Sequence, residues 1–140
     1  MIRKIGLLLM VMLISTSFAA ATASQDNEYT IVPVKSDITI TPRWVTTTIT
    51  QGETNWHGVP ISSYTTALYV DLNWGDTSDS LRLKVHTPSG QLIGTYYDSS
   101  DGVIDGRIKF AIRNSDGIDI GTWHYEVYGY SVSGTEDYYI

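Results

Sequence analysis

The sequence has 140 residues, a formal net charge of −6 and no cysteine. This length fits one domain with a modest core. The acidic excess disfavours nucleic acids and anionic membranes as partners, because their phosphates would be repelled. The lack of cysteine excludes the disulfide framework that many small exported domains use. The fold must therefore rely on packing, or on packing together with a bound ion.

The N-terminal 23 residues have the pattern of a cleavable signal peptide. Arg3 and Lys4 form a positively charged start, residues 5–14 are apolar, and small residues follow at 21–23. We expect cleavage after Ala23, with the bond after residue 21 as the alternative. The apolar run is shorter than the roughly 20 residues that span a bilayer. We therefore expect a secreted or cell-surface protein with no stable membrane anchor after cleavage.

The polar segment at residues 24–37 shows little periodicity. It is typical of a flexible lead-in or of an edge strand, and we take it as a lead-in to a domain at residues 38–140.

Period-two alternation then recurs along the chain, and helical periodicity is absent. It is clearest at residues 67–74, 80–86, 107–113 and 122–128 and weaker at 38–40, 45–50, 55–59, 92–96 and 137–140. Gly-, Asp- and Ser-rich turns separate these segments. About eight short strands without intervening helices indicate an all-β fold, an antiparallel β-sandwich.

Three stretches of the sequence occur in an order that resembles the bacterial pre-peptidase C-terminal domain. They are residues 51–56 with the strand at 68–74, residues 79–90 and residues 121–129. The resemblance covers residues 51–140. It implies a jelly-roll-like sandwich without catalysis that binds or stabilises a partner, and some relatives bind calcium. Family members usually follow a peptidase, and none precedes this domain, so we expect a stand-alone secreted version.

Three carboxylates, Asp98, Asp101 and Asp105, lie within one short loop. Calcium prefers six to eight hard oxygen ligands, which such a loop can supply in part. The loop does not fit the EF-hand pattern, so a site would need help, for example from Asp76 and Asp79. The sequence thus offers these five aspartates as candidate Ca²⁺ ligands. The alternative is a pair of ordinary Asp-Gly turns without metal.

Ten tyrosines and four tryptophans form the other chemical feature of this chain. The candidates for ligand binding are Tyr69, Tyr96, Tyr97 and Tyr128, which could stack on sugar rings or on a protein partner. The alternative is that tyrosines on neighbouring strands only stabilise their sheet.

The sequence contains no Gly-x-Ser-x-Gly elbow and no pair of histidines at metal-ligand spacing. We therefore expect a non-catalytic module for binding or stabilisation, linked to calcium where the acidic loop is occupied. Its expected partner is a protein or a polysaccharide at the cell surface. A carbohydrate-binding module or an adhesion protein is the first alternative, and a small hydrolase using Asp98, Asp101 or Asp105 is the second.

Overall fold

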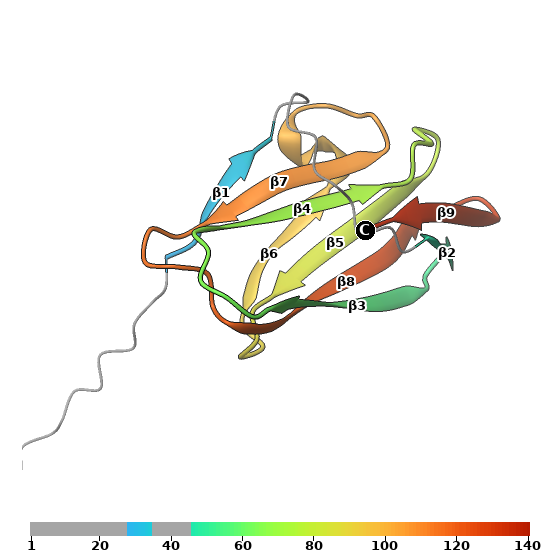
Figure 1. The fold of residues 1–140 in the computed structure, drawn as a ribbon. Coiled ribbons are helices and arrows are strands. Elements are labelled where there is room, and N and C mark those ends of the chain that lie inside the picture. Colours follow the sequence, from blue (N-terminus) through green and yellow to red (C-terminus); the bar gives the residue numbers. More distant parts are fainter. Residues whose placement is uncertain (1–27, 35–45) are drawn as a thin grey trace, which may run out of the picture.

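A computed structural model describes residues 28–34 and 46–140 (Figure 1). The signal peptide at 1–23 and the expected strand at 38–40 lie outside these residues. The described chain is all-β, with nine strands and one short 3₁₀ helix. The elements are β1 (Thr30–Pro33), β2 (Thr46–Thr50), β3 (Thr54–Ile61), β4 (Ala67–Asn73), β5 (Ser80–His86), β6 (Leu92–Tyr97), η1 (Asp98–Asp101), β7 (Arg107–Arg113), β8 (Gly121–Ser131) and β9 (Thr135–Tyr139).

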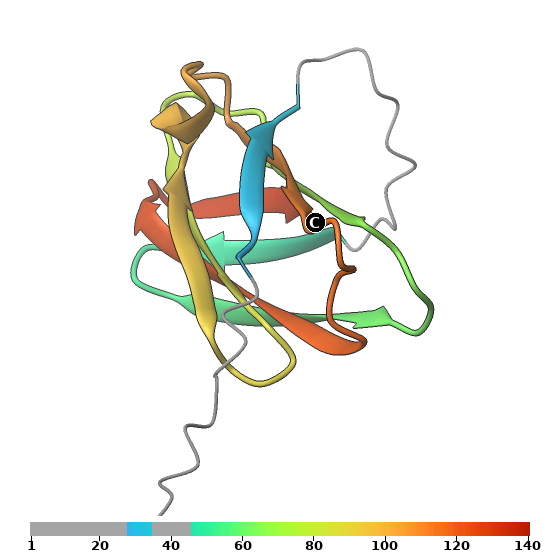
Figure 2. The same cartoon turned by 90° about the vertical axis from the view of Figure 1, so that its left-hand side faces the viewer.

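The strands form two antiparallel sheets that pack face to face (Figures 1 and 2). The five-stranded sheet has the order β1-β7-β4-β9-β2, and the four-stranded sheet has the order β3-β8-β5-β6. Without β1, the two sheets have the strand orders of an eight-stranded jelly roll. The expected sandwich and its jelly-roll character are therefore confirmed.

Strand β1 corrects the expectation of a flexible lead-in at residues 24–37. It pairs antiparallel with β7, with Thr30 opposite Arg113 and Pro33 opposite Phe110. β1 is an edge strand, where Pro33 is tolerated because the edge does not need every N–H. The half-buried side chain of Ile31 packs against the core. The edge-strand alternative thus holds for part of this segment.

The core lies between the sheets and follows the predicted alternation. Leu81, Leu83 and Val85 point inward from β5 and are fully buried, as are Trp123 and Val127 from β8. Further inward-facing positions are Leu68, Val70 and Leu72 on β4 and Ile108, Phe110 and Ile112 on β7. This apolar burial, at about 25 cal/mol per Å², is the main stabilising contribution in a fold without disulfides.

Several turns meet at one end of the sandwich, which we call the loop end. The N–H groups of Trp74 and Gly75, which follow β4, donate to the carbonyl of Gly106 before β7, both at 2.9 Å. Gly106 has φ +73°, and a Cβ atom there would lie 2.8 Å from the carbonyl carbon of Gly75. Only glycine fits this close approach, which joins the β4–β5 turn to the loop before β7.

Candidate functional site at the loop end

Three carboxylates converge at the loop end. Asp76 and Asp79 come from the β4–β5 turn, and Glu136 is the second residue of β9. One oxygen from each lies within 4.8 Å of the others. Asp76 is exposed, whereas Asp79 is 6% exposed and Glu136 is 9% exposed. Among the described residues, this carboxylate trio is the group of acids and histidines close enough to share a metal ion.

The turn that carries the two aspartates is fixed by hydrogen bonds. The indole Nε1 of Trp74 donates to the carbonyl oxygens of Asp76, at 2.9 Å, and Asp79, at 3.2 Å. The Asp76 carboxylate accepts the hydroxyl and the backbone N–H of Ser78, and these bonds lower the pKa of Asp76. Asp79 Oδ1 accepts the N–H of Ser133 at 3.0 Å, which joins this turn to the β8–β9 turn. The carboxylates are therefore held in place by the fold.

Glu136 is the electrostatically unusual member of the trio. Burial, followed by the interaction with Asp79 and the charge of Asp76, raises the pKa of Glu136 to about 7. A carboxyl that holds its proton near neutral pH lacks a compensating positive charge. A divalent cation would supply that charge, and carboxylate oxygens are the ligands that Ca²⁺ prefers.

The acidic loop, which carries Asp98, Asp101 and Asp105, is organised by hydrogen bonds within the loop itself. The Asp98 carboxylate accepts the backbone N–H groups of Asp105, Gly106 and Arg107 at 3.1–3.2 Å. Asp101 accepts the N–H of Val103 at 3.0 Å. Asp98 therefore closes the loop before β7, much as a capping residue satisfies a helix end. Of the five aspartates expected at a metal site, the structure brings Asp76 and Asp79 together with Glu136 and leaves Asp98, Asp101 and Asp105 out of that group.

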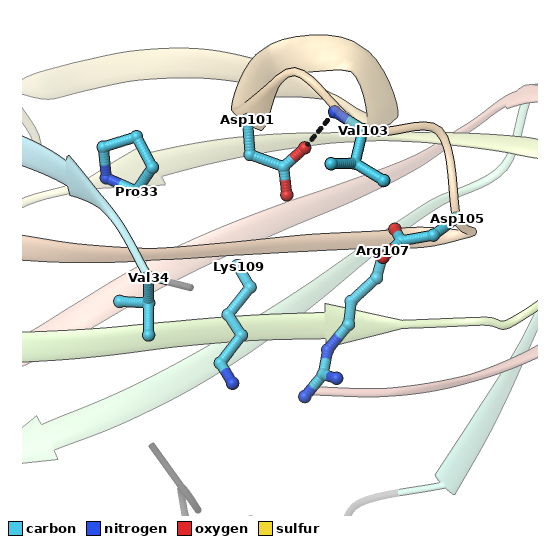
Figure 3. Close-up of a pocket in the computed structure, with 7 residues that line it drawn as sticks. All are labelled: Pro33, Val34, Asp101, Val103, Asp105, Arg107 and Lys109. Atoms are coloured by element: carbon cyan, nitrogen blue, oxygen red, sulfur yellow. Dashed lines mark hydrogen bonds between the residues drawn. The ribbon is translucent and has the colours of Figure 1, made fainter. Parts of the chain in front are cut away.

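Asp101 and Asp105 line a pocket of about 450 Å³ on the outside of the five-stranded sheet (Figure 3). Its other walls come from Pro33, Val34, Val103, Arg107 and Lys109. Burial, and then the charges of Asp101 and Asp98, raise the pKa of Asp105. Arg107 is held from the other side by a two-pronged ion pair with Asp71, at 2.7 and 2.5 Å. The pocket thus contains both acidic and basic side chains, and Arg107 is already paired with Asp71 of β4.

A second hollow of about 460 Å³ opens at the loop end beside the trio. Its walls include Tyr97, Tyr130, Ile104, Asp79, Ser80 and Ser99, and Thr77 and Asp98 complete it. We call this hollow the tyrosine groove. The rings of Tyr97 and Tyr130 meet edge to face with centroids 5.3 Å apart. Asp79 belongs both to the groove and to the carboxylate trio.

A β-bulge sets the position of Tyr130. Ser80 pairs with Ser131 while the next residue, Leu81, pairs with Gly129, so Tyr130 is the extra residue on β8. The side-chain amide of Gln51 holds the backbone just after the bulge: it donates to the carbonyl of Tyr130 at 3.1 Å and accepts the N–H of Val132 at 2.7 Å. Bulges re-aim a side chain and are frequent beside binding sites. The bulge leaves Tyr130 52% exposed next to Tyr97.

The four tyrosines expected to bind a ligand are found in different places. Tyr97 lines the tyrosine groove, and Tyr128 lies nearby on the same outer face, with the Arg82 guanidinium 4.4 Å above its ring. Tyr96 lies on the inner side of β6, half-buried, with its ring 4.2 Å from that of Phe110, so it packs in the core rather than with the exposed tyrosines. Tyr69 is 39% exposed on the other sheet.

Sequence reasoning missed Glu136. The alternation along the strand does place Tyr130 with the outward-facing tyrosines, although not among the four named candidates. A signal for Glu136 existed, because it lies two residues before Tyr138 in a strand, on the same face, and Tyr138 is fully buried. The bulge at Tyr130 depends on the pairing between β5 and β8, which periodicity alone does not show.

The fold and this site define a jelly-roll β-sandwich with an acid cluster and a tyrosine groove at one end. No protein-family model matches this chain, and a search of the curated proteins finds no significant match. Within the described residues, no helix is long and apolar enough to cross a membrane.

Proposed function

We propose that this chain is an exported, non-catalytic β-sandwich module that binds a partner outside the cell and is stabilised by Ca²⁺ at the carboxylate trio. The observation that carries the calcium part is the convergence of Asp76, Asp79 and Glu136 within 4.8 Å at the loop end. Three carboxylates supply up to six oxygens, which is the lower end of the ligand number that calcium takes.

The position of the trio supports a stabilising role for the ion. Asp76 and Asp79 come from the turn after β4, which is in the five-stranded sheet, and this turn leads into β5 in the four-stranded sheet. Glu136 comes from β9, which pairs with β4 only where Asn73 faces Tyr139. An ion held by the three residues would join β9 to the turn beyond β4, beside a weakly paired position in the five-stranded sheet.

The arrangement of the acidic loop supports a non-catalytic role. A hydrolase of this size would need a carboxylate free to act as a base or nucleophile. Asp98 instead accepts three backbone N–H groups, Asp101 accepts one, and Asp105 lies in a pocket whose described lining holds no serine, cysteine or histidine to act with it. Export is supported by the sequence pattern of residues 1–23.

Scanning calorimetry of the purified protein in CaCl₂ and in EDTA tests the calcium part. A ligand at 100 times its Kd stabilises a fold by about 2.7 kcal/mol, which corresponds to a rise in Tm of about 10 °C for a domain of this size. Glu136→Gln should lose most of that rise, whereas Asp137→Asn, at the exposed neighbouring position on β9, should keep it. The same Tm in both solutions would exclude a stabilising calcium ion.

A further inference from the structure

The tyrosine groove presents the kind of surface that binds sugars. Sugars expose apolar C–H faces and hydroxyl edges, and their sites combine aromatic rings with short polar side chains. In this groove the edge-to-face rings of Tyr97 and Tyr130 supply the aromatic surface. Ser80, Ser99 and Thr77 add hydroxyl groups to the same walls. Its volume of about 460 Å³ lies within the range of small-ligand sites.

The charge of the groove selects among sugars. Asp79 and Asp98 are carboxylates on its wall, and the described residues that line it include no lysine, arginine or histidine. An anionic ligand, such as a uronate or a sulfated sugar, would therefore meet carboxylates and no basic side chain among the residues that line the groove. Asp98 already accepts three backbone N–H groups, so the hydroxyl groups of a neutral sugar would pair instead with those of Ser80, Ser99 and Thr77. The charge complementarity thus favours an uncharged polyol.

The groove is also built into the fold. Gly129 precedes the bulge, and its N–H and carbonyl bond to the β2–β3 turn, at Glu53 and Gly52. The Gln51 side chain from that turn bonds to the carbonyl of Tyr130 and to the N–H of Val132. These contacts fix the backbone that carries the exposed ring, so that little of the binding free energy is lost in ordering it.

From these features we infer that the tyrosine groove binds a neutral glycan, with its sugar rings against Tyr97 and Tyr130 and its hydroxyl groups toward the polar wall. The inference rests on the proposed binding function and names its ligand class. The two rings and the hydroxyl groups that carry it lie in the groove, and only Asp79 is shared with the carboxylate trio.

Affinity electrophoresis in gels that contain hydroxyethylcellulose, laminarin, mannan or polygalacturonate tests this inference. We expect retardation by at least one of the three neutral polysaccharides and none by polygalacturonate. Tyr130→Ala and Tyr97→Ala should each weaken binding by about tenfold, since each removes one stacking surface. Tyr69→Ala removes an exposed tyrosine from the other sheet and should leave binding unchanged.

Two further variants separate binding from folding. Tyr130→Phe keeps the ring and should retain most of the affinity. Ile104→Ala removes an apolar contact from the groove wall and should lower affinity. Because Ile104 is 67% exposed, its replacement should leave Tm unchanged.

Retardation by polygalacturonate alone would overturn the assignment of the ligand as a neutral glycan. Equal binding of a neutral polysaccharide by the wild type, Tyr97→Ala and Tyr130→Ala would overturn the groove but keep the binding module. No retardation by any polysaccharide would overturn the inference, while the calcium-dependent Tm would still decide the stabilising role of the ion separately.

Discussion

The indole Nε1 of Trp74 lies 3.2 Å from the carbonyl oxygen of Asp79 and donates a buried hydrogen bond to it. The same N–H reaches the carbonyl of Asp76 at 2.9 Å. Trp74 therefore forms the inner support of the turn that supplies two members of the carboxylate trio. Any ion that draws the trio together changes the surroundings of this indole.

This contact makes Trp74 a reporter of metal binding. Addition of CaCl₂ to the EDTA-treated protein should change the intensity or wavelength of its tryptophan fluorescence, because the charge beside the indole changes. Trp74→Phe should lose the change. Trp56→Phe removes an exposed tryptophan from β3 and should keep it. A calcium signal that persists in Trp74→Phe and vanishes in Trp56→Phe would place the ion elsewhere.

The raised pKa of Glu136 predicts a pH dependence of stability. Its pKa is about 7 in the folded protein against an ordinary value of 4.5. Between these values the folded state binds more protons than the unfolded state, so this group lowers the free energy of unfolding as pH rises from about 4.5 to 7. This contribution is complete by about pH 7 and constant above it.

Urea unfolding of the wild type and Glu136→Gln in EDTA measures this effect. The variant should gain stability relative to the wild type between pH 4.5 and 8, because glutamine does not lose a proton. In CaCl₂ at pH 8 the order should reverse, since the variant lacks one ligand. A difference in the free energy of unfolding between the two proteins that does not change with pH would contradict a raised pKa of Glu136.

The role of Asp98 in closing its loop predicts a large cost for its removal. Asp98→Ala leaves the N–H groups of Asp105, Gly106 and Arg107 without their acceptor, and we expect a loss of about 3 kcal/mol in the free energy of unfolding. Asp101→Ala, which removes one exposed hydrogen bond to Val103, should cost about 0.5 kcal/mol. Similar losses in the two variants would show that Asp98 does not organise the loop.

The sandwich could be predicted because alternation depends only on which face of a strand meets the core. Leu81, Leu83 and Val85 are a clear case, since each is fully buried on one side of β5. The edge strand β1 was harder, because an edge has one neighbour and a short exposed pattern. Only Ile31 of its four residues is half-buried.

The site was less predictable because it depends on which turns meet. Asp98 and Asp79 have the same side chain, and the sequence places both in Gly- and Ser-rich turns. Asp98 faces three N–H donors of its own loop, whereas Asp79 faces Glu136 from a strand more than 50 residues away in the chain. This difference arises from the order of strands in the sheets, which local patterns do not encode.

The contact between Gly129 and the β2–β3 turn predicts that this glycine cannot be replaced. A Cβ atom at Gly129 would lie 2.1 Å from the carbonyl oxygen of Thr50, far inside the contact distance. Gly129→Ala must therefore push the turn away from β8, break its bonds to Gly52 and Glu53, and release the bulge at Tyr130. We expect a loss of at least 3 kcal/mol in the free energy of unfolding, measured in urea.

Gly134→Ala is the matched control, because its φ of +75° strains an alanine while no atom lies within 4 Å of the added Cβ. That backbone strain alone should cost about 1 kcal/mol. Equal costs in the two variants would mean that the turn does not hold β8 at this point.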